Sequence, residues 1–157
     1  MCIYCKNMKP KIADHDIVTY KLMIHRYNVN SWTFESYVRG FKYTLGKTYT
    51  EALFPDLLRE HTVRGDEMVY ASREGFYTWE SFGRAKDEIR PFRGDLNGRV
   101  IVRCIIPKGT RYYCDNDEFG CGRTFCSEKI IIDAYYRQGA HPTWVSMKDG
   151  KLVEHAE

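Results

Sequence analysis

Six cysteines are the residues of this chain whose type and spacing could bind a metal ion. Cys2 and Cys5 form a C-x2-C pair near the N-terminus, and Cys121 and Cys126 form a C-x4-C pair. Structural zinc takes four thiolate or imidazole ligands in a tetrahedron, usually two from each of two tight turns. The spacing therefore predicts one zinc ion held by these four cysteines, with Cys114 as the substitute ligand.

A second interpretation of the cysteines needs no metal. Cys104 falls on the apolar face of an expected strand and is then a core residue, while the other five are thiols of loops without a fixed role. The two interpretations differ in their consequence for folding, because the binding free energy of zinc would become folding free energy.

The segment around the later cysteines predicts a hairpin with a long loop. Residues 111–114 continue a strand, and residues 128–136 place Ile130, Ile132 and Ala134 on one face. Between them, Gly120 and Gly122 permit a tight turn. We therefore expect residues 114–126 to be a loop inserted between two paired strands, and zinc would tie this loop to the N-terminus.

Other catalytic signatures are incomplete in the sequence. The five histidines are scattered, and residues 141–143 supply only one of the two H-x-T motifs that a two-histidine phosphoesterase needs. The acidic segment at residues 115–126 has Phe119 and Cys126 where a calcium loop of the EF-hand type needs oxygen ligands. No phosphate-binding loop, dinucleotide-binding glycine motif or nucleophile-elbow serine occurs.

The composition is that of one folded domain rich in aromatic residues. The chain has 157 residues, of which 43% are hydrophobic and 15% aromatic, including 12 tyrosines. Aromatic residues favour strands, and tyrosine adds a polar tip that suits half-buried sheets and binding clefts. The net charge of +3 is too small to indicate nucleic-acid binding by itself.

Neither a secretory signal nor a membrane span is expected. The N-terminus lacks a basic region followed by an apolar run, and no stretch approaches the length of about 18 apolar residues that a span needs. We therefore expect a cytoplasmic protein without a membrane partner, whose cysteines are reduced.

Hydrophobic periodicity predicts the elements that position these residues. Strands are expected over residues 16–25, 31–38, 41–49, 74–79, 99–106 and 128–136, and one or two helical turns over residues 55–61. One principal helix is expected over residues 79–92, capped by Thr78 or Ser81. Asp149-Gly150 indicates a closing hairpin.

These elements sum to an α+β fold with a mainly antiparallel, twisted β-sheet and one principal helix. We expect an N-terminal arm over residues 1–15 and a single domain over residues 16–157. In the first long strand, Val18, Tyr20, Leu22 and Ile24 form the apolar face.

A series of short motifs runs through residues 40–136. They are G-K-T-Y at 46–49, G-F at 75–76, a helix containing Ala85, V-x-C-x-I-P-K-G-T-x-Y-Y at 102–113 and S-x-K-I at 127–130. In this order they resemble a group of small uncharacterised proteins of phage and gut-bacterial genomes. The resemblance implies no activity, but it implies a phage or mobile-element context, residence in the host cytoplasm and a possible anti-defence role.

A second series of motifs resembles ADP-ribosyltransferases. The segment G-F-Y-T at 75–78 precedes the helix, P-K-G-T at 107–110 ends a strand, and Glu128 opens the next strand. The resemblance implies an ADP-ribosyltransferase-like fold and NAD as the co-substrate. It also implies that Glu128 is the catalytic carboxylate, stabilising an oxocarbenium-like ribose.

Two further positions bear on that resemblance. Arg39 or His25 would seat NAD if the family's arrangement holds. The chain departs from the family at Trp79, which replaces a serine, and at Cys126, where a glutamate or glutamine usually directs the acceptor.

The leading functional hypothesis is a non-enzymatic protein that binds a host protein or a small nucleotide-like ligand. The candidate ligand-binding residues are Arg39, Tyr77, Trp79, Arg111, Tyr112 and Tyr113. The alternatives are NAD-dependent ADP-ribosyl transfer and nucleic-acid binding. The latter would use a stripe of arginines interrupted by acidic residues, namely Arg84, Arg90, Arg93, Arg99 and Arg103.

Overall fold

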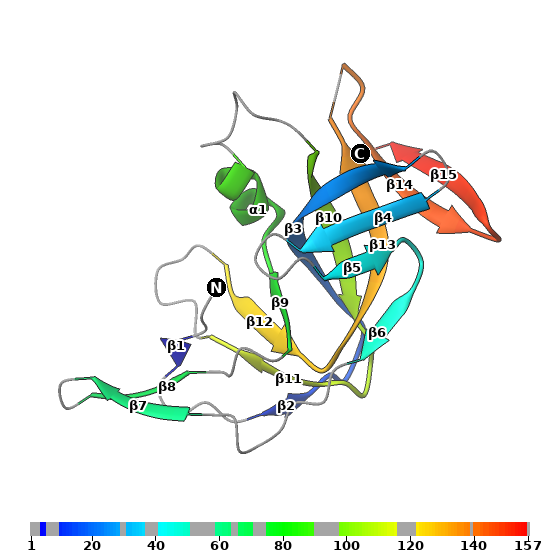
Figure 1. Ribbon diagram of the computed structural model, residues 1–157. Coiled ribbons are helices and arrows are strands. Elements are labelled where there is room, and N and C mark those ends of the chain that lie inside the picture. Colours follow the sequence, from blue (N-terminus) through cyan, green and yellow to red (C-terminus); the bar gives the residue numbers. More distant parts are fainter. Residues whose placement is uncertain are drawn as a thin grey trace.

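Antiparallel β-sheet dominates the structure (Figure 1). The computed structural model describes residues 4–5, 10–28, 31–36, 41–50, 59–63, 66–70, 75–89, 98–115, 122–138 and 140–156. Its strands are β1 (Tyr4–Cys5), β2 (Lys11–Ile12), β3 (Ile17–Asn28), β4 (Ser31–Ser36), β5 (Lys42–Thr44), β6 (Thr48–Thr50), β7 (Arg59–Val63), β8 (Asp66–Tyr70), β9 (Phe76–Trp79), β10 (Arg99–Ile106), β11 (Arg111–Cys114), β12 (Thr124–Ser127), β13 (Lys129–Arg137), β14 (Thr143–Lys148) and β15 (Lys151–Ala156).

The helix of the described residues is α1 (Phe82–Ile89). Every pair of neighbouring strands in these ranges is antiparallel. The predicted α+β class, with a mainly antiparallel sheet and one helix, is therefore confirmed.

The larger sheet curls into a ring that contains β3, which pairs along both of its edges. One edge pairs with β10, and the other pairs with β4 and, at Tyr20, with β9. From β10 the ring continues through β13 to β6, and from β4 it continues to β5. The turn between β5 and β6 closes the ring, since the amide of Gly46 donates to the carbonyl of Ile132 at 2.7 Å.

Further strands extend the sheet on both sides of this ring (Figure 1). On one side, β9 leads to β12, β11 and β2. On the other side, β13 leads to β14 and β15. A separate three-stranded sheet has the order β1-β8-β7. The predicted N-terminal arm thus contributes one strand to each sheet.

The inner face of the curled sheet holds the larger hydrophobic core. The four residues that alternate along β10, from Val100 to Ile106, are all buried there, as predicted. The buried members of this inner core are Ala13, Met23, Phe34, Tyr43, Leu45, Phe76, Val100, Val102, Cys104, Ile106, Cys114, Phe125, Ile130, Ile132, Tyr135 and Val145.

The apolar face that the sequence indicates for β3 is the outer face of the sheet. Thr19 and Met23 point into the inner core, whereas Tyr20 and Leu22 pack on the opposite face. Val18 lies on that opposite face too and is 47% exposed. Alternation cannot identify the inner face here, because other residues cover both faces of the middle of β3.

The helix α1 covers part of the outer face. Phe82 and Ala85 pack there against Trp79, Ile101 and Trp144. Ser81 caps the helix, because the amide of Arg84 donates to its hydroxyl oxygen at 3.3 Å. The predicted start at residue 79 is wrong, since Trp79 ends β9; residues 90–92 lie outside the described ranges.

Two other sequence predictions are corrected. Residues 59–61 belong to β7 rather than to a helical turn, so their local pattern is overridden by pairing with β8. The expected loop at residues 114–126 is shorter, because residues 124–126 belong to β12, and β11 pairs with β12 rather than with β13. All four residues of β12 are buried, so this strand lacks the alternation that would have indicated it.

The closing hairpin has the predicted turn. Asp149 and Gly150 both have positive φ, at 51° and 73°, as a two-residue type I′ turn requires. The turn fixes the register of β14 against β15, with Lys148 opposite Lys151 and Trp144 opposite His155.

We predict that Gly122→Ala destabilises the protein more than Gly109→Ala. The two glycines have nearly equal φ, +85° and +84°, so the backbone strain of an alanine is matched. A Cβ at residue 122 would lie 2.9 Å from the Cβ of Ser81, the helix cap, whereas residue 109 faces open space. Urea denaturation should show a loss of about 1 kcal/mol for Gly109→Ala and at least about 1 kcal/mol more for Gly122→Ala. Equal losses in the free energy of unfolding would show that contact with Ser81 adds nothing to the cost of Gly122→Ala.

Candidate functional site

The structure brings three of the sequence-predicted residues into one row. Strands β9, β12 and β11 are neighbours, and Tyr77, Cys126 and Tyr113 lie opposite one another across them. By alternation along β9, this row shares the outer face with Trp79. Tyr113 is 4% exposed and Cys126 is fully buried, whereas Tyr77 is half-buried. Little of this row is open to a ligand.

Arg111, two residues before Tyr113 on β11, lies on the same face as this row, but two other predicted ligand residues do not join it. Tyr112 lies on the inner face, where its ring centroid is 5.7 Å from that of Phe125. Trp79 is buried in the outer core beneath α1, and its indole N–H has no hydrogen-bond partner among the described residues. Arg39 lies outside the described ranges. The predicted set therefore does not form one surface.

Glu128, the carboxylate implied by the ADP-ribosyltransferase resemblance, is bound to Arg111. The Nε and Nη2 atoms of Arg111 lie 2.8 Å and 2.5 Å from the same Oε1 atom. Both side chains are largely buried, at 29% and 26% exposed. Beside them, burial raises the pKa of Tyr113, an effect that Arg111 opposes and that Cys126 and Glu128 strengthen. The carboxylate thus has a structural partner within its own sheet.

The register of β11 against β12 separates two of the candidate zinc ligands. Cys114 lies opposite Phe125, and Cys126 lies opposite Tyr113, so the two cysteines point to opposite faces. Cys114 belongs to the inner core, and the ammonium group of Lys11 donates to its sulfur at 3.6 Å. Cys114 and Cys126 therefore face different sides of the sheet, and the part of Cys114 as substitute ligand stays a prediction.

The remaining candidate zinc ligands are outside the part of the chain that the structure describes. These are Cys2, Cys121 and the side chain of Cys5. Among the described residues, no group of three or more His, Cys, Asp or Glu side chains is placed to hold a metal ion. Zinc binding by these cysteines stays a prediction.

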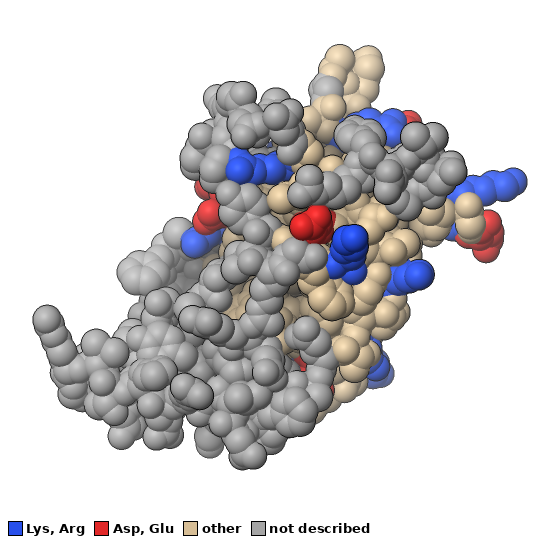
Figure 2. Space-filling model, viewed as in Figure 1, with Lys and Arg blue, Asp and Glu red and all other residues tan. Residues whose placement is uncertain are grey.

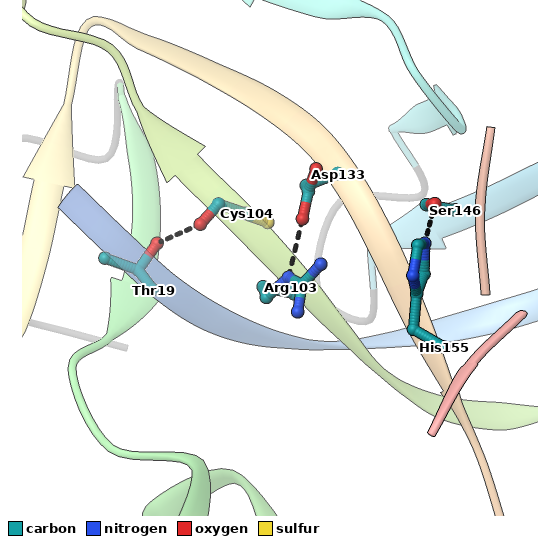
Figure 3. A network of polar contacts seen from close by, with 6 residues as sticks. All are labelled: Thr19, Arg103, Cys104, Asp133, Ser146 and His155. Carbon is teal, nitrogen blue, oxygen red and sulfur yellow. Dashed lines mark hydrogen bonds and ion pairs between the residues drawn. The ribbon is translucent and has the colours of Figure 1, made fainter. Parts of the chain in front are cut away.

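Cys104 is the core residue that the metal-free interpretation expects. It is fully buried, and burial raises the pKa of its thiol to about 12; nearby Lys21 lowers this pKa and Asp133 raises it. The hydroxyl of Thr19 donates to the carbonyl oxygen of Cys104 at 3.4 Å (Figure 3). At neutral pH this thiol is protonated and shielded from solvent, so its role is packing.

A cluster of four aromatic rings on the outer face is the most distinctive arrangement of side chains near the helix. The aromatic cluster consists of Tyr20, Phe82, Tyr136 and Trp144. The centroid of Phe82 lies 5.5 Å from Tyr20, 5.0 Å from Tyr136 and 5.3 Å from Trp144. Tyr136 and Trp144 are mostly buried, while Tyr20 and Phe82 are half-buried. The cluster therefore presents ring surface to solvent through Tyr20 and Phe82.

Two cations lie on these rings. The ammonium group of Lys86 is 4.4 Å from the centroid of Phe82, and the guanidinium carbon of Arg103 is 5.1 Å from a ring of Trp144. Attraction between a cation and an aromatic face contributes about 0.5–1 kcal/mol at exposed sites. Aromatic rings and cations side by side are the surface that planar, anionic ligands bind.

Arg103 is also paired with Asp133 on the neighbouring strand (Figure 3). Its Nε atom donates to the Oδ2 atom of Asp133 at 2.5 Å. The register between β10 and β13 shifts at Arg103 and Cys104, and this irregularity gives Asp133 no direct partner on β10. Bulges of this kind re-aim side chains and are common next to functional sites.

A serine–histidine pair lies on the same outer face. The Oγ atom of Ser146 is 2.8 Å from the Nε2 atom of His155 (Figure 3). Sequence analysis missed this pair, although the register imposed by the turn at residues 149–150 would have placed the two residues diagonally on one face. His155 is exposed, and no acidic partner orients its ring among the described residues. The pair therefore lacks the third member of a hydrolytic triad.

The predicted arginine stripe is not a basic patch where the structure describes it. Arg84 pairs with Glu88 at 3.6 Å and Arg103 pairs with Asp133, while Arg90 and Arg93 lie outside the described ranges. Figure 2 shows described lysines and arginines at separate places on one face of the molecule, some with acidic side chains beside them. This distribution gives no support to nucleic-acid binding through a continuous stripe.

His25, the other residue named for NAD, packs among inner-face aromatic rings. Its ring centroid lies 5.1 Å from Phe34 and 5.6 Å from Tyr135. Burial against these rings lowers the pKa of His25 from its ordinary value of 6.5. These contacts make His25 a packing residue of the inner face.

Comparisons with known proteins identify no relative. No protein-family model, no curated protein and no solved structure matches the chain. The ADP-ribosyltransferase-like fold therefore finds no support. Within the described ranges, no helix has the length and apolarity needed to cross a bilayer.

We predict that His25 makes the folded state less stable in mild acid. Because its folded-state pKa lies below 6.5, the unfolded chain binds the proton more readily. The free energy of unfolding should be fully retained above about pH 6.5 and should fall as the pH drops from there towards the lowered pKa. His25→Phe keeps an aromatic ring without a titrating group, so urea denaturation at pH 8 and pH 5 should show a smaller loss for the variant. An identical loss in both proteins would show that His25 does not contribute.

We predict that untagged protein carries about one zinc ion per chain. Cys126→Ala should remove the metal, whereas Cys114→Ala, on the adjacent strand but the opposite face, should retain it. Elemental analysis measures the metal content, and a chelator should lower the melting temperature only of the loaded proteins. Less than about a tenth of an equivalent of zinc in the wild type, or a melting temperature indifferent to chelator, leaves the metal-free interpretation.

Proposed function

We propose that the protein is a non-enzymatic binding protein whose ligand is a small nucleotide-like molecule or a host protein. The aromatic cluster with its two cations is the observation that supports this proposal. It lies on the outer face of the sheet and combines half-buried rings with positive charge. Planar bases stack on aromatic side chains, and each stacked base contributes about 1–3 kcal/mol.

Of the two proposed ligands, a nucleotide fits the chemistry of the aromatic cluster more closely than a host protein does. Tyr20 and Phe82 offer half-buried rings, while Lys86 and Arg103 supply charge close to those rings. A nucleotide needs both features, because its base is planar and its phosphate is anionic. A host protein could use the same rings as an anchor for an aromatic or basic side chain.

Catalysis is not part of the proposal. The carboxylate of Glu128 is bound to Arg111, and the serine–histidine pair has no acidic partner among the described residues. NAD-dependent ADP-ribosyl transfer would need a carboxylate available to the ribose. The phage or mobile-element context, with a role against host defences, enters the proposal through the motifs at residues 40–136 alone.

We predict that nucleosides or nucleotides raise the melting temperature of the purified protein. Phe82→Leu and Tyr20→Leu keep apolar bulk but remove a ring from the cluster, and each should weaken binding roughly tenfold. Phe41→Leu is the matched control, because Phe41 is an exposed ring that packs on Tyr43 and Tyr49 instead. Titrations followed by tryptophan fluorescence measure the affinities.

Two results would contradict this proposal. The first is the absence of any thermal shift with nucleosides, nucleotides and NAD, combined with no host protein retained from a lysate. The second is an equal loss of affinity in Phe41→Leu and Phe82→Leu, which would remove the aromatic cluster from the binding site. Retention of a host protein that Phe82→Leu no longer binds would support a host protein as the ligand.

A further inference from the structure

We propose that Arg103 anchors an anion subsite on the outer face of the sheet, and that this subsite takes the phosphate of the nucleotide-like ligand. The inference rests on the proposed function and adds the polar half of the ligand to it. Two contacts hold the guanidinium group in place. Its Nε atom is bonded to Asp133 at 2.5 Å, and its carbon lies 5.1 Å from a ring of Trp144.

The terminal nitrogens of Arg103 are available to a ligand. The hydrogen bond and ion pair of this side chain both use Nε, so Nη1 and Nη2 have no protein partner among the described residues. The side chain is 28% exposed, so Arg103 is not sealed off from solvent. Two parallel N–H groups of one guanidinium match two oxygens of a phosphate, and such pairs are roughly twice as strong as neutral hydrogen bonds.

The neighbouring strands leave room for this side chain to extend sideways. Arg103, Ala134 and Ser146 lie opposite one another on β10, β13 and β14, and the middle residue carries only a methyl group. The guanidinium carbon of Arg103 lies 5.1 Å from a ring of Trp144, and Trp144 also lies 6.0 Å from Tyr20 on β3, so the indole of Trp144 leans over β13 towards β10. The guanidinium group of Arg103 therefore lies beside this indole, on the face that carries the aromatic cluster.

The next hydrogen-bonding groups on that face are suited to an anion. Ser146 lies in the same row, and its hydroxyl oxygen is bonded to His155. When the Nε2 atom of His155 donates this hydrogen bond, the serine hydroxyl is left to donate its own proton to a ligand. A phosphate at Arg103 would thus have a second donor on the strand that carries Trp144.

The charges around the cluster favour an anion without forming a strongly basic surface. Arg103 and Lys86 are positive and Asp133 is negative, so these three side chains sum to one positive charge. Asp133 also fixes the orientation of Arg103, which makes it a positioning residue rather than a ligand-binding one. Recognition then depends on the direction of the hydrogen bonds more than on net charge.

The experiment compares adenosine with adenosine monophosphate on the full chain. Binding is followed by the shift of the Trp144 indole N–H in nitrogen–proton correlation spectra, assigned with Trp144→Phe. We expect the wild type to bind the monophosphate at least about tenfold more tightly than the nucleoside. Arg103→Gln should abolish this preference, so that the variant binds the monophosphate and adenosine with equal affinity.

Arg137→Gln is the matched control. Arg137 is also paired with a carboxylate, that of Glu154, but alternation along β13 places it on the opposite face from Tyr136 and the aromatic cluster. This variant should retain the preference for the monophosphate. Unchanged Trp79 indole signals show that each variant is folded.

The outcomes separate this inference from the proposed function. Equal affinities for adenosine and its monophosphate in the wild type, or a preference that survives Arg103→Gln, would overturn the anion subsite while nucleoside binding still supports the proposed function. If neither compound binds, a nucleotide is not the ligand of the proposed function. The anion subsite is then tested by titrating the protein with inorganic phosphate. A Trp144 shift with phosphate that Arg103→Gln abolishes supports the subsite; no shift overturns it.

Discussion

The pairing of β3 along both of its edges is the constraint on which the rest of the structure depends. Met23 and Ile24 pair with β10 on one side and with β4 on the other, and Tyr20 pairs with β9. A strand in that position has both its hydrogen-bonding edges and both its faces in use. Its inner residues close the larger core, and its outer residues, Tyr20 and Leu22, support the helix and the aromatic cluster. The proposed binding surface and the larger core therefore lie on opposite faces of one strand.

Sequence patterns predicted the elements whose signals are local. The strand β10 is strongly apolar and alternating, the turn at Asp149-Gly150 has the residues that positive φ requires, and Ser81 has the side chain that a helix start needs. The short strand β12 was not predicted, because its four residues are all buried and include Thr124 and Ser127. Only its long-range pairing with β9 and β11 makes it a strand.

The candidate site could not be predicted from the sequence, because its members come from elements far apart in the chain. Tyr20, Phe82, Arg103 and Trp144 lie on β3, α1, β10 and β14, and no local motif connects them. The sequence predicts aromatic and basic residues as the binding groups, and the proposed site is of the same chemical kind. It placed them at Tyr112 and Tyr113, which alternation along β11 sends to opposite faces. A shift of one residue in register exchanges the faces of a strand, so a site on a sheet is only as predictable as its register.

The shift in register between β10 and β13 bears on both the core and the proposed binding surface. On the inner side of the shift, Cys104 and Ile132 remain opposite each other and fully buried, so the core is continuous. On the outer face of the sheet, Asp133 has no residue directly opposite it on β10, and its carboxylate pairs with Arg103 instead. The guanidinium group is then oriented by a carboxylate and an aromatic ring in the absence of ligand. The entropic cost of ordering this long side chain therefore belongs to folding and not to binding. A side chain held in this way needs little rearrangement to bind a ligand, so one small irregularity in a regular sheet orients the arginine of the proposed site.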